Sequence, residues 1–220
     1  MSDPMENRGE RRPVMVAGAP LQWSRRLTAL AAAANPLLAA DSGADHLARI
    51  GLRPSAVIGD LDSISAATRD WLGEEILIPR PEQDRTDLDK ALEHAFATLD
   101  LAELTVLAAM GGRPDHEVGN LGLLARLHMG DRLRFEGQDH HILALEGEAV
   151  LAARPGEVWS FWSYDPTILV SVEGVRWPVR DAPLDASGRP SISNRAVDNQ
   201  VGVVANGGPV VVMRWFDQAP

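Results

Sequence analysis

Over the first 132 residues, short apolar runs alternate with segments in which apolar residues recur every three or four positions. The runs at 14–17 and 36–40 have the length of buried strands, and the segment 87–99 has helical spacing. Strands that alternate with helices in this way are typical of βαβ units. The pattern therefore predicts an α/β domain over residues 13–132, built on a parallel, doubly wound sheet covered on both faces. The other elements predicted here are helices at 23–34, 44–50, 67–71 and 117–129, and strands at 56–58, 75–78 and 104–108.

The pattern changes after Arg132, where helical spacing gives way to short strands broken by glycine and proline. Runs rich in β-branched and aromatic residues occur at 158–162, 168–172 and 210–215. We therefore predict an antiparallel all-β domain over residues 133–220, a sandwich or a barrel, and take the sandwich as the assignment. The Pro- and Asp-rich stretch 180–190 is predicted to be a long loop.

Composition narrows the classes of partner that the chain is expected to bind. Its 220 residues carry a formal net charge of -10, which argues against nucleic acid, because binding the phosphate backbone needs clustered lysine and arginine. We find no apolar run near the ~18 residues needed to span a bilayer, so no membrane partner is expected. The polar opening, residues 1–12, is predicted to be a disordered tail without a signal peptide. The lack of cysteine excludes a disulfide scaffold and fits a cytoplasmic protein.

Aspartates follow several of the predicted strands, where parallel sheets bind their ligands. Asp41 comes directly after one strand, Asp60 and Asp62 after the next, and Asp87 opens a predicted helix. Asp115 lies in the stretch that follows the strand at 104–108. We therefore expect these carboxylates on one rim of the sheet.

Carboxylates that converge repel one another by on the order of 4 kcal/mol per pair at 4 Å and an effective dielectric constant of 20. A cation removes this repulsion, and ligands that are all oxygen favour Mg²⁺, which also binds substrate phosphates. Arg85 and Arg113 lie on the same predicted rim, and a guanidinium suits phosphate through its bidentate geometry. The rim therefore indicates phosphoryl-type transfer, in which positioning and charge neutralisation provide most of the catalysis.

Each cluster also has an interpretation without function. Asp and Gly are common in turns, and Thr86 with Asp89 fits the capping box of a helix. His116 fits either a phosphate ligand or a helix cap, and His140-His141 is interpreted as a solvated hairpin rather than a metal pair. No Walker-type Gly-Lys-Ser/Thr loop is present. A single cluster thus favours turn chemistry, whereas four on one rim favour a site.

Taken in order, these segments resemble the thiamine pyrophosphokinase family. The matching stretches are Ala40-Asp41-Ser42-Gly43-Ala44-Asp45, Gly59-Asp60-Leu61-Asp62-Ser63-Ile64, Asp84-Arg85-Thr86-Asp87, Gly111-Gly112-Arg113-Pro114-Asp115-His116 continuing to Asn120, Gly174-Val175-Arg176-Trp177-Pro178-Val179 and Ser191-Ile192-Ser193-Asn194. They extend from about residue 37 to 215. Singly they are weak, and together they are specific.

The resemblance implies an ATP-binding α/β domain, a β-sandwich that helps to hold thiamine, and a homodimer with thiamine at the subunit interface. Under it, the residues that hold Mg²⁺ or position the hydroxyethyl oxygen are Asp60, Asp62 and Asp87. Those expected near ATP are Asp41, Arg85, Arg113, Asp115 and His116. Those expected to line the thiamine site are Trp177, Ser191, Ser193 and Asn194. The sequence departs from the family pattern at Ser42, Arg85, Pro114 and Arg195, which bears on loop shape and thiamine contacts. Trp177 fits the core of the sandwich equally well.

The mechanism that follows is a direct displacement, in which the thiamine alcohol attacks the β-phosphorus of ATP and AMP leaves. Either Asp87 or Asp62 accepts or orients the hydroxyl proton. One rival hypothesis is a diphosphokinase acting on another alcohol, such as a hydroxymethyl pterin. Others are a metal-dependent phosphodiesterase that uses the same acidic rim, and a nucleotide sensor without catalysis.

Overall fold

The computed structural model describes residues 12–216, so the predicted tail lies outside the described residues except for Arg12. The described chain divides into two compact units. The first comprises residues up to Asn120 together with 135–138, and the second comprises 121–134 and 139 onward. Among the described residues, no helix combines the length and the apolar character needed to cross a membrane.

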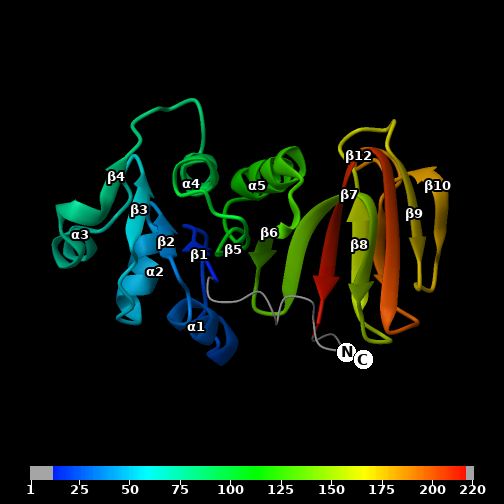
Figure 1. Cartoon of the computed structure of the whole chain (residues 1–220), viewed down its shortest axis with the longest axis horizontal. Helices are drawn as coiled ribbons and strands as arrows, with labels where there is room; N and C mark the ends of the chain where they lie inside the picture. The colour runs from blue at the N-terminus through cyan, green and yellow to red at the C-terminus, as the bar shows by residue number, and fades with distance from the viewer. Residues whose placement is uncertain (1–11, 217–220) are drawn as a thin grey trace. The chain divides into compact units, whose positions relative to one another are not determined.

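The first unit contains a parallel five-stranded sheet in the order β5-β1-β2-β3-β4 (Figure 1). Its elements are β1 (Val14–Val16), α1 (Arg25–Ala32), β2 (Leu37–Ala40), α2 (Gly43–Arg49), β3 (Ala56–Gly59), α3 (Ala66–Leu72), a 3₁₀ turn (Glu74–Ile76), β4 (Leu77–Pro79), α4 (Asp87–Glu93), a π-helical turn (His94–Thr98), β5 (Leu104–Leu107) and the start of α5 (Pro114–Leu127). Because the chain passes from β4 at one edge back to β5 beside β1, the strand order reverses at β1. That reversal marks the place where open α/β sheets bind ligands.

The sheet is buried on both faces, and its strands are apolar at nearly every position, with Thr105 of β5 as an exception. One set of alternate strand residues, such as Val14 and Val57, packs with Leu27, Leu47 and Leu72 from α1, α2 and α3. The opposite face is covered by α4, so α1 and α4 lie on different sides of the sheet (Figure 1). This confirms the predicted parallel, doubly wound sheet.

Serine and threonine side chains fix where three of these helices begin. Ser24 accepts a hydrogen bond from the backbone N–H of Leu27, and Ser65 accepts one from Thr68. Thr86 accepts one from the backbone N–H of Asp89 at 3.3 Å, as the capping pattern predicts. This cap places Asp87 in the first turn of α4.

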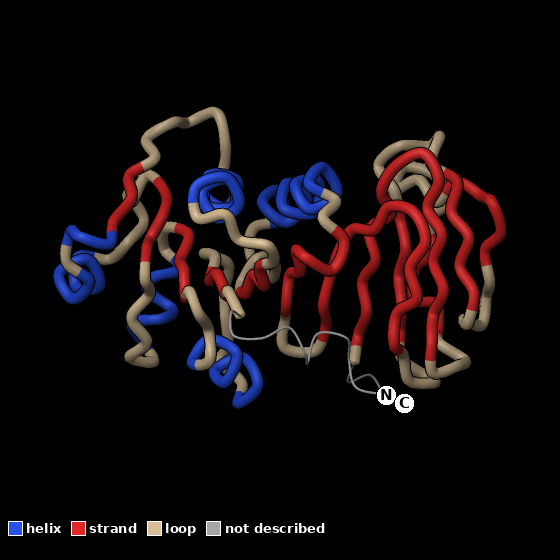
Figure 2. The backbone as a smooth tube through the Cα atoms, in the orientation of Figure 1, coloured by secondary structure: helices blue, strands red, loops and turns tan. Residues whose placement is uncertain are grey.

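The second unit is an antiparallel sandwich in which two long strands serve both sheets. Beyond α5, the described residues form strands and loops (Figure 2). The strands are β6 (Gly130–Glu136), β7 (His140–Ala152), β8 (Val158–Trp162), β9 (Leu169–Glu173), β10 (Val179–Pro183), β11 (Ser191–Arg195) and β12 (Gln200–Trp215). The first half of β12 pairs with β9 and the second half with β8, while β7 pairs with both halves. The pairing register shifts between Ala205 and Val210, where the strand passes from one sheet to the other.

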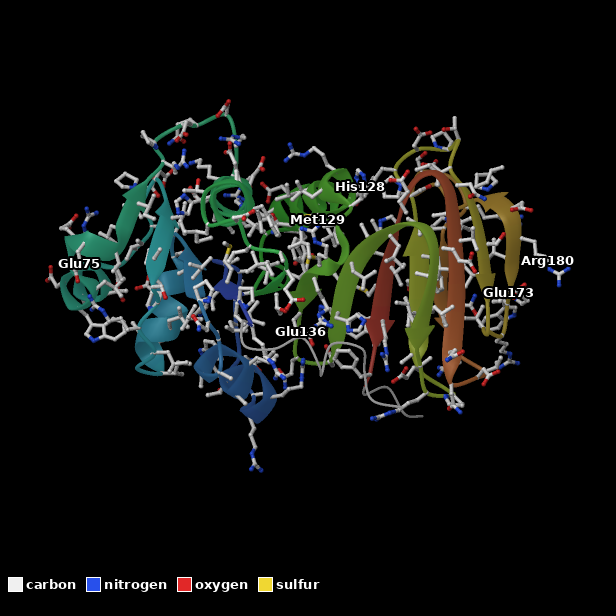
Figure 3. The ribbon with its side chains drawn as sticks, viewed as in Figure 1. Glu75, His128, Met129, Glu136, Glu173 and Arg180 are labelled. Carbon is white, nitrogen blue, oxygen red and sulfur yellow. The ribbon has the colours of Figure 1, made fainter. Side chains whose placement is uncertain are left out.

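The core of this unit lies between the two sheets. Trp159 and Phe161 from β8 pack with Val170 and Val172 from β9 and with Val203 from β12, and all are nearly inaccessible to water. The edge strand β10 presents Arg180 to solvent, and its neighbour β9 presents Glu173 (Figure 3). Charges on an edge strand disfavour pairing with other chains. The predicted all-β character of this region is confirmed.

Three local predictions are wrong. Helix α5 begins at Pro114 rather than at 117, because proline suits the first helical turn, where its missing N–H is not needed. The predicted loop 180–190 contains most of β10, whose Asp181 bonds to Ser171 on β9. The predicted strand 75–78 begins only at Leu77, because Glu74–Ile76 form a 3₁₀ turn. The hairpin predicted at His140-His141 is present, between β6 and β7, although His140 is partly buried and its ring lies 4.7 Å from that of Trp215.

Candidate functional site

A cavity of about 670 Å³ opens at the carboxyl ends of the parallel strands. It is lined by segments that follow β1, β2, β3 and β5, together with the first turn of α4 and part of α5. Among the lining residues are Gly18, Asp41, Asp87, Arg113, His116 and Asn120. The cavity therefore lies on the predicted rim.

Three of the predicted aspartates converge beside this cavity. Asp41, Asp60 and Asp87 each place one carboxylate oxygen within 4.8 Å of the others. The three come from separate segments: the turn after β2, the loop after β3 and the first turn of α4. The backbone N–H of Asp60 also donates to Oδ1 of Asp87 at 3.1 Å, which joins two of these segments. We call these three residues the acidic triad.

Asp41 is the most deeply buried member of the acidic triad, with 4% of its surface exposed. Its Oδ1 atom is buried and has no hydrogen-bond partner among the described residues. Burial raises the pKa of Asp41 to about 6, helped by the nearby charges of Asp87 and Asp60 and opposed by hydrogen bonds from Ser42 and Ser63. Its backbone φ is +43°, in the left-handed region that costs non-glycine residues energy. A buried, unpaired carboxylate oxygen on a strained residue indicates a position shaped for a ligand.

Gly59 allows the segments of the acidic triad to approach one another. Its φ is +156°, and a Cβ atom placed there would lie 2.9 Å from Cβ of Asp41 and 3.2 Å from Oδ1 of Asp87. Any larger residue would therefore push these two carboxylates apart. Glycine is required here by the close approach of the backbone as well as by its conformation.

Two residues that the sequence did not single out hold the carboxylates of the acidic triad. Lys90 lies one turn beyond Asp87 on α4, and its Nζ is 3.0 Å from Oδ1 of Asp87 and 3.9 Å from Oδ2 of Asp60. Gln83 donates from Nε2 to Oδ2 of Asp60 at 3.2 Å. Although desolvation acts to raise the pKa of Asp60, these groups and the backbone N–H of Asp62 lower it. The i, i+3 spacing of Asp87 and Lys90 was the available signal, but it is equally typical of exposed helix surfaces.

The chemistry of the acidic triad fits a hard divalent cation. Its donors are all oxygen, they converge from three segments, and one of them is a buried oxygen of Asp41 without a partner. Such a set suits Mg²⁺, whereas zinc sites usually include nitrogen or sulfur.

Asp62 lies near the acidic triad without joining it. Its side chain is exposed, and its Oδ1 accepts a hydrogen bond from Oγ of Ser63 at 2.8 Å. Its backbone N–H donates to Oδ1 of Asp60 at 3.3 Å. Leu61, between the two aspartates, has a φ of +65°, so the loop is not extended as predicted, and Asp62 interacts with Asp60 without reaching Asp41 and Asp87 together. This loop geometry was not visible in the alternating sequence Asp60-Leu61-Asp62.

The predicted phosphate ligands are held by neighbouring carboxylates. Arg113 lines the cavity and makes a bidentate pair with Asp115, at 3.1 and 2.5 Å, which lowers the pKa of Asp115 to about 2. His116 also lines the cavity, whereas Asp115 is not among its lining residues. Arg85 is not among them either, and its Nη1 lies 2.6 Å from Oε2 of Glu93.

The loop after β5 is shaped by two residues of α5. Asn120 is buried and donates from Nδ2 to the carbonyl of Ala109 at 2.7 Å. Glu117 accepts a hydrogen bond from the backbone N–H of Gly111 at 2.8 Å. These contacts hold a loop whose Ala108 has a φ of +55°. Glu117 was not predicted, because a single glutamate in a helix carries no distinctive pattern.

The second unit has a cavity of its own, of about 560 Å³. Its lining residues are Val158, Ser160, Trp162, Ala186, Pro190, Ile192, Ser193, Met213 and Trp215. Ser193 has a φ of +58°, and its backbone N–H donates to Oγ of Ser160 at 3.1 Å. Of the four residues predicted to bind thiamine, Ser193 lines this cavity.

The other three predicted thiamine residues form a structural clamp. Asn194 is 1% exposed; its Nδ2 donates to the carbonyl of Trp177 at 2.7 Å, and its Oδ1 accepts from the Trp177 N–H at 3.1 Å. Its Nδ2 also donates to Oγ of Ser191, and its Oδ1 accepts from the N–H of Arg195. The indole of Trp177 itself is exposed, under the guanidinium of Arg176. Asn194 therefore ties the segment around Trp177 to β11.

Fold and site together describe a two-unit protein with a candidate cation site. An α/β unit carries an acidic triad and a cavity on the rim of its parallel sheet, and an antiparallel sandwich follows it in the chain. Residues 27–134 match the family model described as thiamin pyrophosphokinase, catalytic domain.

Individual relatives agree with this match. Thiamine pyrophosphokinase 1 of Oryza sativa subsp. japonica is 34% identical over 131 residues, which is 49% of this chain and 47% of the relative. Thiamine pyrophosphokinase of Bacillus subtilis (strain 168) is 29% identical over 133 residues, 58% of this chain and 61% of the relative. Thiamine pyrophosphokinase 1 of Arabidopsis thaliana is 39% identical over 82 residues, 34% of this chain and 31% of the relative. The matched segment is thus less than two thirds of each relative. Residues 27–134, just under half of the chain, therefore belong to the catalytic-domain family of thiamine pyrophosphokinases.

Solved structures extend the likeness of the fold to nearly the whole chain. Thiamin pyrophosphokinase from Candida albicans superposes with a TM-score of 0.78 at 17% identity, covering 94% of this chain and 90% of that one. The structure of thiamine pyrophosphokinase from Bacillus subtilis gives a TM-score of 0.76 at 22% identity, covering 94% and 100%. At these identities the comparison shows that the fold is shared.

Proposed function

We propose that this protein is a thiamine diphosphokinase, which transfers the diphosphate group of ATP to the hydroxyethyl group of thiamine and releases AMP. The observation that carries the proposal is the acidic triad, with the buried, unpartnered Oδ1 of Asp41, beside a cavity on the ligand-binding rim of the sheet. A cavity of about 670 Å³ is large enough for a nucleotide. Membership of the family supplies the choice of substrates.

In this proposal, Mg²⁺ is held by Asp41, Asp60 and Asp87. When bound there, the ion would supply charge neutralisation for the phosphate oxygens. The sequence assigned metal binding to Asp60, Asp62 and Asp87, with Asp41 assisting. The convergence of the acidic triad favours Asp41 as a ligand over Asp62.

The chain's own residues position the two substrates. Asp62, exposed beside the acidic triad, accepts or orients the proton of the thiamine hydroxyl as its oxygen attacks the β-phosphorus. Arg113 and His116 line the cavity and bind the phosphates; Arg113 exchanges its contact with Asp115 for the nucleotide. Asp115 thus acts on ATP through Arg113, and Arg85 contributes positive charge from the neighbouring loop. No covalent enzyme intermediate is needed.

For thiamine, we propose that Ser193 contacts the substrate, while Ser191 and Asn194 fix the loop that carries it. Trp177 offers an exposed aromatic face for stacking on a heteroaromatic ring. We also propose that the chain acts as a cytoplasmic homodimer with thiamine bound at the subunit interface, and that residues 13–132 and 133–220 form its two domains.

The test is to incubate the protein with ATP, Mg²⁺ and thiamine and to identify the products by chromatography. The expected result is AMP and thiamine diphosphate in equal amounts, with none formed when thiamine is omitted. ADP and thiamine monophosphate would overturn the direct transfer of diphosphate. Hydrolysis that does not require thiamine would support a phosphodiesterase instead, and turnover only with a hydroxymethyl pterin would support the rival diphosphokinase. MgATP binding by calorimetry with no turnover on any alcohol would support a sensor.

A further inference from the structure

The chain has a single lysine, Lys90, against twenty arginines, since lysine and arginine together number 21 and Lys90 is the only lysine in the sequence. Apart from its six histidines, every other basic side chain of the chain is therefore a guanidinium. The exception is also the most buried charged side chain in the acidic triad's surroundings, at 2% exposure. A position that keeps lysine in such a composition indicates a need for a compact ammonium group rather than for positive charge alone.

The Lys90 ammonium joins three segments that carry or support the acidic triad. It donates to the carbonyl of Arg80, after β4, at 3.1 Å. It also donates to Oδ1 of Asp87, in the first turn of α4, at 3.0 Å. Oδ2 of Asp60, in the loop after β3, lies 3.9 Å away. An ammonium has three donors, and a planar guanidinium could not replace it in a nearly closed space without displacing these groups.

In the described part of the chain, Lys90 contacts only two members of the acidic triad, so the carboxylate of Asp41 stays available to a cation. Oδ1 of Asp87 accepts from both Lys90 and the backbone N–H of Asp60. No hydrogen bond or ion pair joins Lys90 to Asp41 among the described contacts. With all groups ionised, three carboxylates and one ammonium carry a formal charge of -2, which matches a divalent cation.

We propose that Lys90 is a positioning residue, which holds the carboxylates of Asp60 and Asp87 in place for a divalent cation without contacting either substrate. The inference rests on the proposed function for the identity of the ion. Whatever the ion, the buried ammonium of Lys90 preorganises the acidic triad. Without Lys90, the carboxylates of Asp60 and Asp87 move apart or take up a proton. Binding of the cation must then bring them together, which weakens its affinity.

The test measures cation binding in the absence of ATP and thiamine. Mn²⁺ is titrated into the nucleotide-free protein, and free ion is followed by electron paramagnetic resonance, for wild type, Lys90→Met, Lys90→Arg and the control Arg69→Met. Arg69 is exposed and pairs only with Glu74 among the described contacts. We expect Lys90→Met to weaken Mn²⁺ binding at least tenfold, Lys90→Arg to weaken it as well, and Arg69→Met to leave it unchanged. Equal or tighter binding by Lys90→Met overturns the proposal, because Lys90 would then merely compete with the cation.

A second measurement keeps the proposal open to refutation if the variants do not fold. Because the chain has one lysine, wild-type protein grown with ¹⁵Nζ-labelled lysine gives one side-chain signal. That signal is expected to shift on addition of Mg²⁺ and to return with EDTA; an unmoved signal in a protein that binds Mg²⁺ contradicts the proposal. Neither readout depends on turnover. A chain that binds Mn²⁺ through a Lys90-dependent site but forms no thiamine diphosphate would refute the proposed function alone.

Discussion

The acidic triad and the Asn194 clamp both contain deeply buried polar side chains, yet their bonding differs. Asn194 has partners for both its amide nitrogen and its oxygen, supplied by Trp177, Ser191 and Arg195. Asp41, buried to a similar degree, keeps one carboxylate oxygen unpaired on a strained backbone. A buried polar group costs stability unless it is bonded, so the satisfied side chain contributes to the fold, whereas the unsatisfied one supports the proposed ligand site. Asn194 and Asp41 both lie in segments that match the family pattern, but their bonding distinguishes a residue that stabilises the fold from one proposed to bind a ligand.

The largest effect is expected within the acidic site. Asp87→Asn removes a charge that the cation requires, and we expect kcat to fall on the order of 10³-fold together with a loss of Mn²⁺ affinity. Asp62→Asn should also lower kcat, because Asp62 orients the hydroxyl in the proposed mechanism, but it should leave Mn²⁺ affinity unchanged. Steady-state kinetics and metal titration measure the two effects separately. If Asp62→Asn weakens Mn²⁺ binding as much as Asp87→Asn does, Asp62 is a ligand and its exposed position is misleading.

The next largest effect is expected on stability, at Asn194 of the clamp. Asn194→Ala leaves the backbone N–H and carbonyl of Trp177 without partners, and we expect the free energy of unfolding to fall by about 3 kcal/mol. Asn206→Ala, at an exposed position of the same sandwich, is the matched control. Urea denaturation followed by tryptophan fluorescence gives both values. A stable Asn194→Ala protein that has lost thiamine binding would instead make Asn194 a ligand.

A smaller effect of the opposite sign is expected for Asp41 in the metal-free protein. Its pKa is 3.8 in the unfolded reference and about 6 in the fold, so stability is full below pH 3.8 and is lost as pH rises through 6. The loss is at most about 3 kcal/mol, and about 2 kcal/mol allowing for residual solvent screening. Asp41→Asn should therefore be more stable than wild type at pH 7.5 in EDTA, and the gain should disappear near pH 4. Thermal unfolding at both pH values measures it; equal gains at both would show that charge is not the cause.

The smallest effect is expected at Trp177. Its indole is 54% exposed, so Trp177→Ala should change the free energy of unfolding by no more than about 0.5 kcal/mol. If the ring stacks on thiamine, KM for thiamine should rise roughly threefold to tenfold, which corresponds to about 0.5–1.5 kcal/mol. Trp177→Phe keeps an aromatic face and should restore most of the affinity. A large loss of stability would place Trp177 in the core, the alternative that the sequence left open.

Much of the fold was predictable, because periodicity reports burial. The strands of the first unit are apolar at nearly every position, and Thr86 caps α4 as its spacing indicates. The convergence of Asp41, Asp60 and Asp87 followed from the rule that parallel strands direct their loops to one rim. The start of α5 was missed because Pro114 was taken as part of a loop, although proline is favoured in a first helical turn.

The rest of the site depends on three-dimensional details that no periodicity contains. Asp62 lies outside the acidic triad in a loop where Leu61 adopts a positive φ, a conformation unusual for leucine. Lys90 resembles an ordinary surface partner of Asp87 until its burial is known. The hairpin at His140 was predicted, but its aromatic neighbour Trp215 was not, because the two residues are distant in sequence.

The long strands β7 and β12 have a consequence for how the sandwich opens. Because each belongs to both sheets, neither sheet can detach while the other stays intact, and opening of either breaks the same pair of strands. The amide protons at the centre of that pair should then exchange with deuterium only through global unfolding, as one cooperative block. The pair also brings together residues as far apart as His140 and Trp215, so the chain must close a long loop before the block forms, and its refolding should be slow for its size.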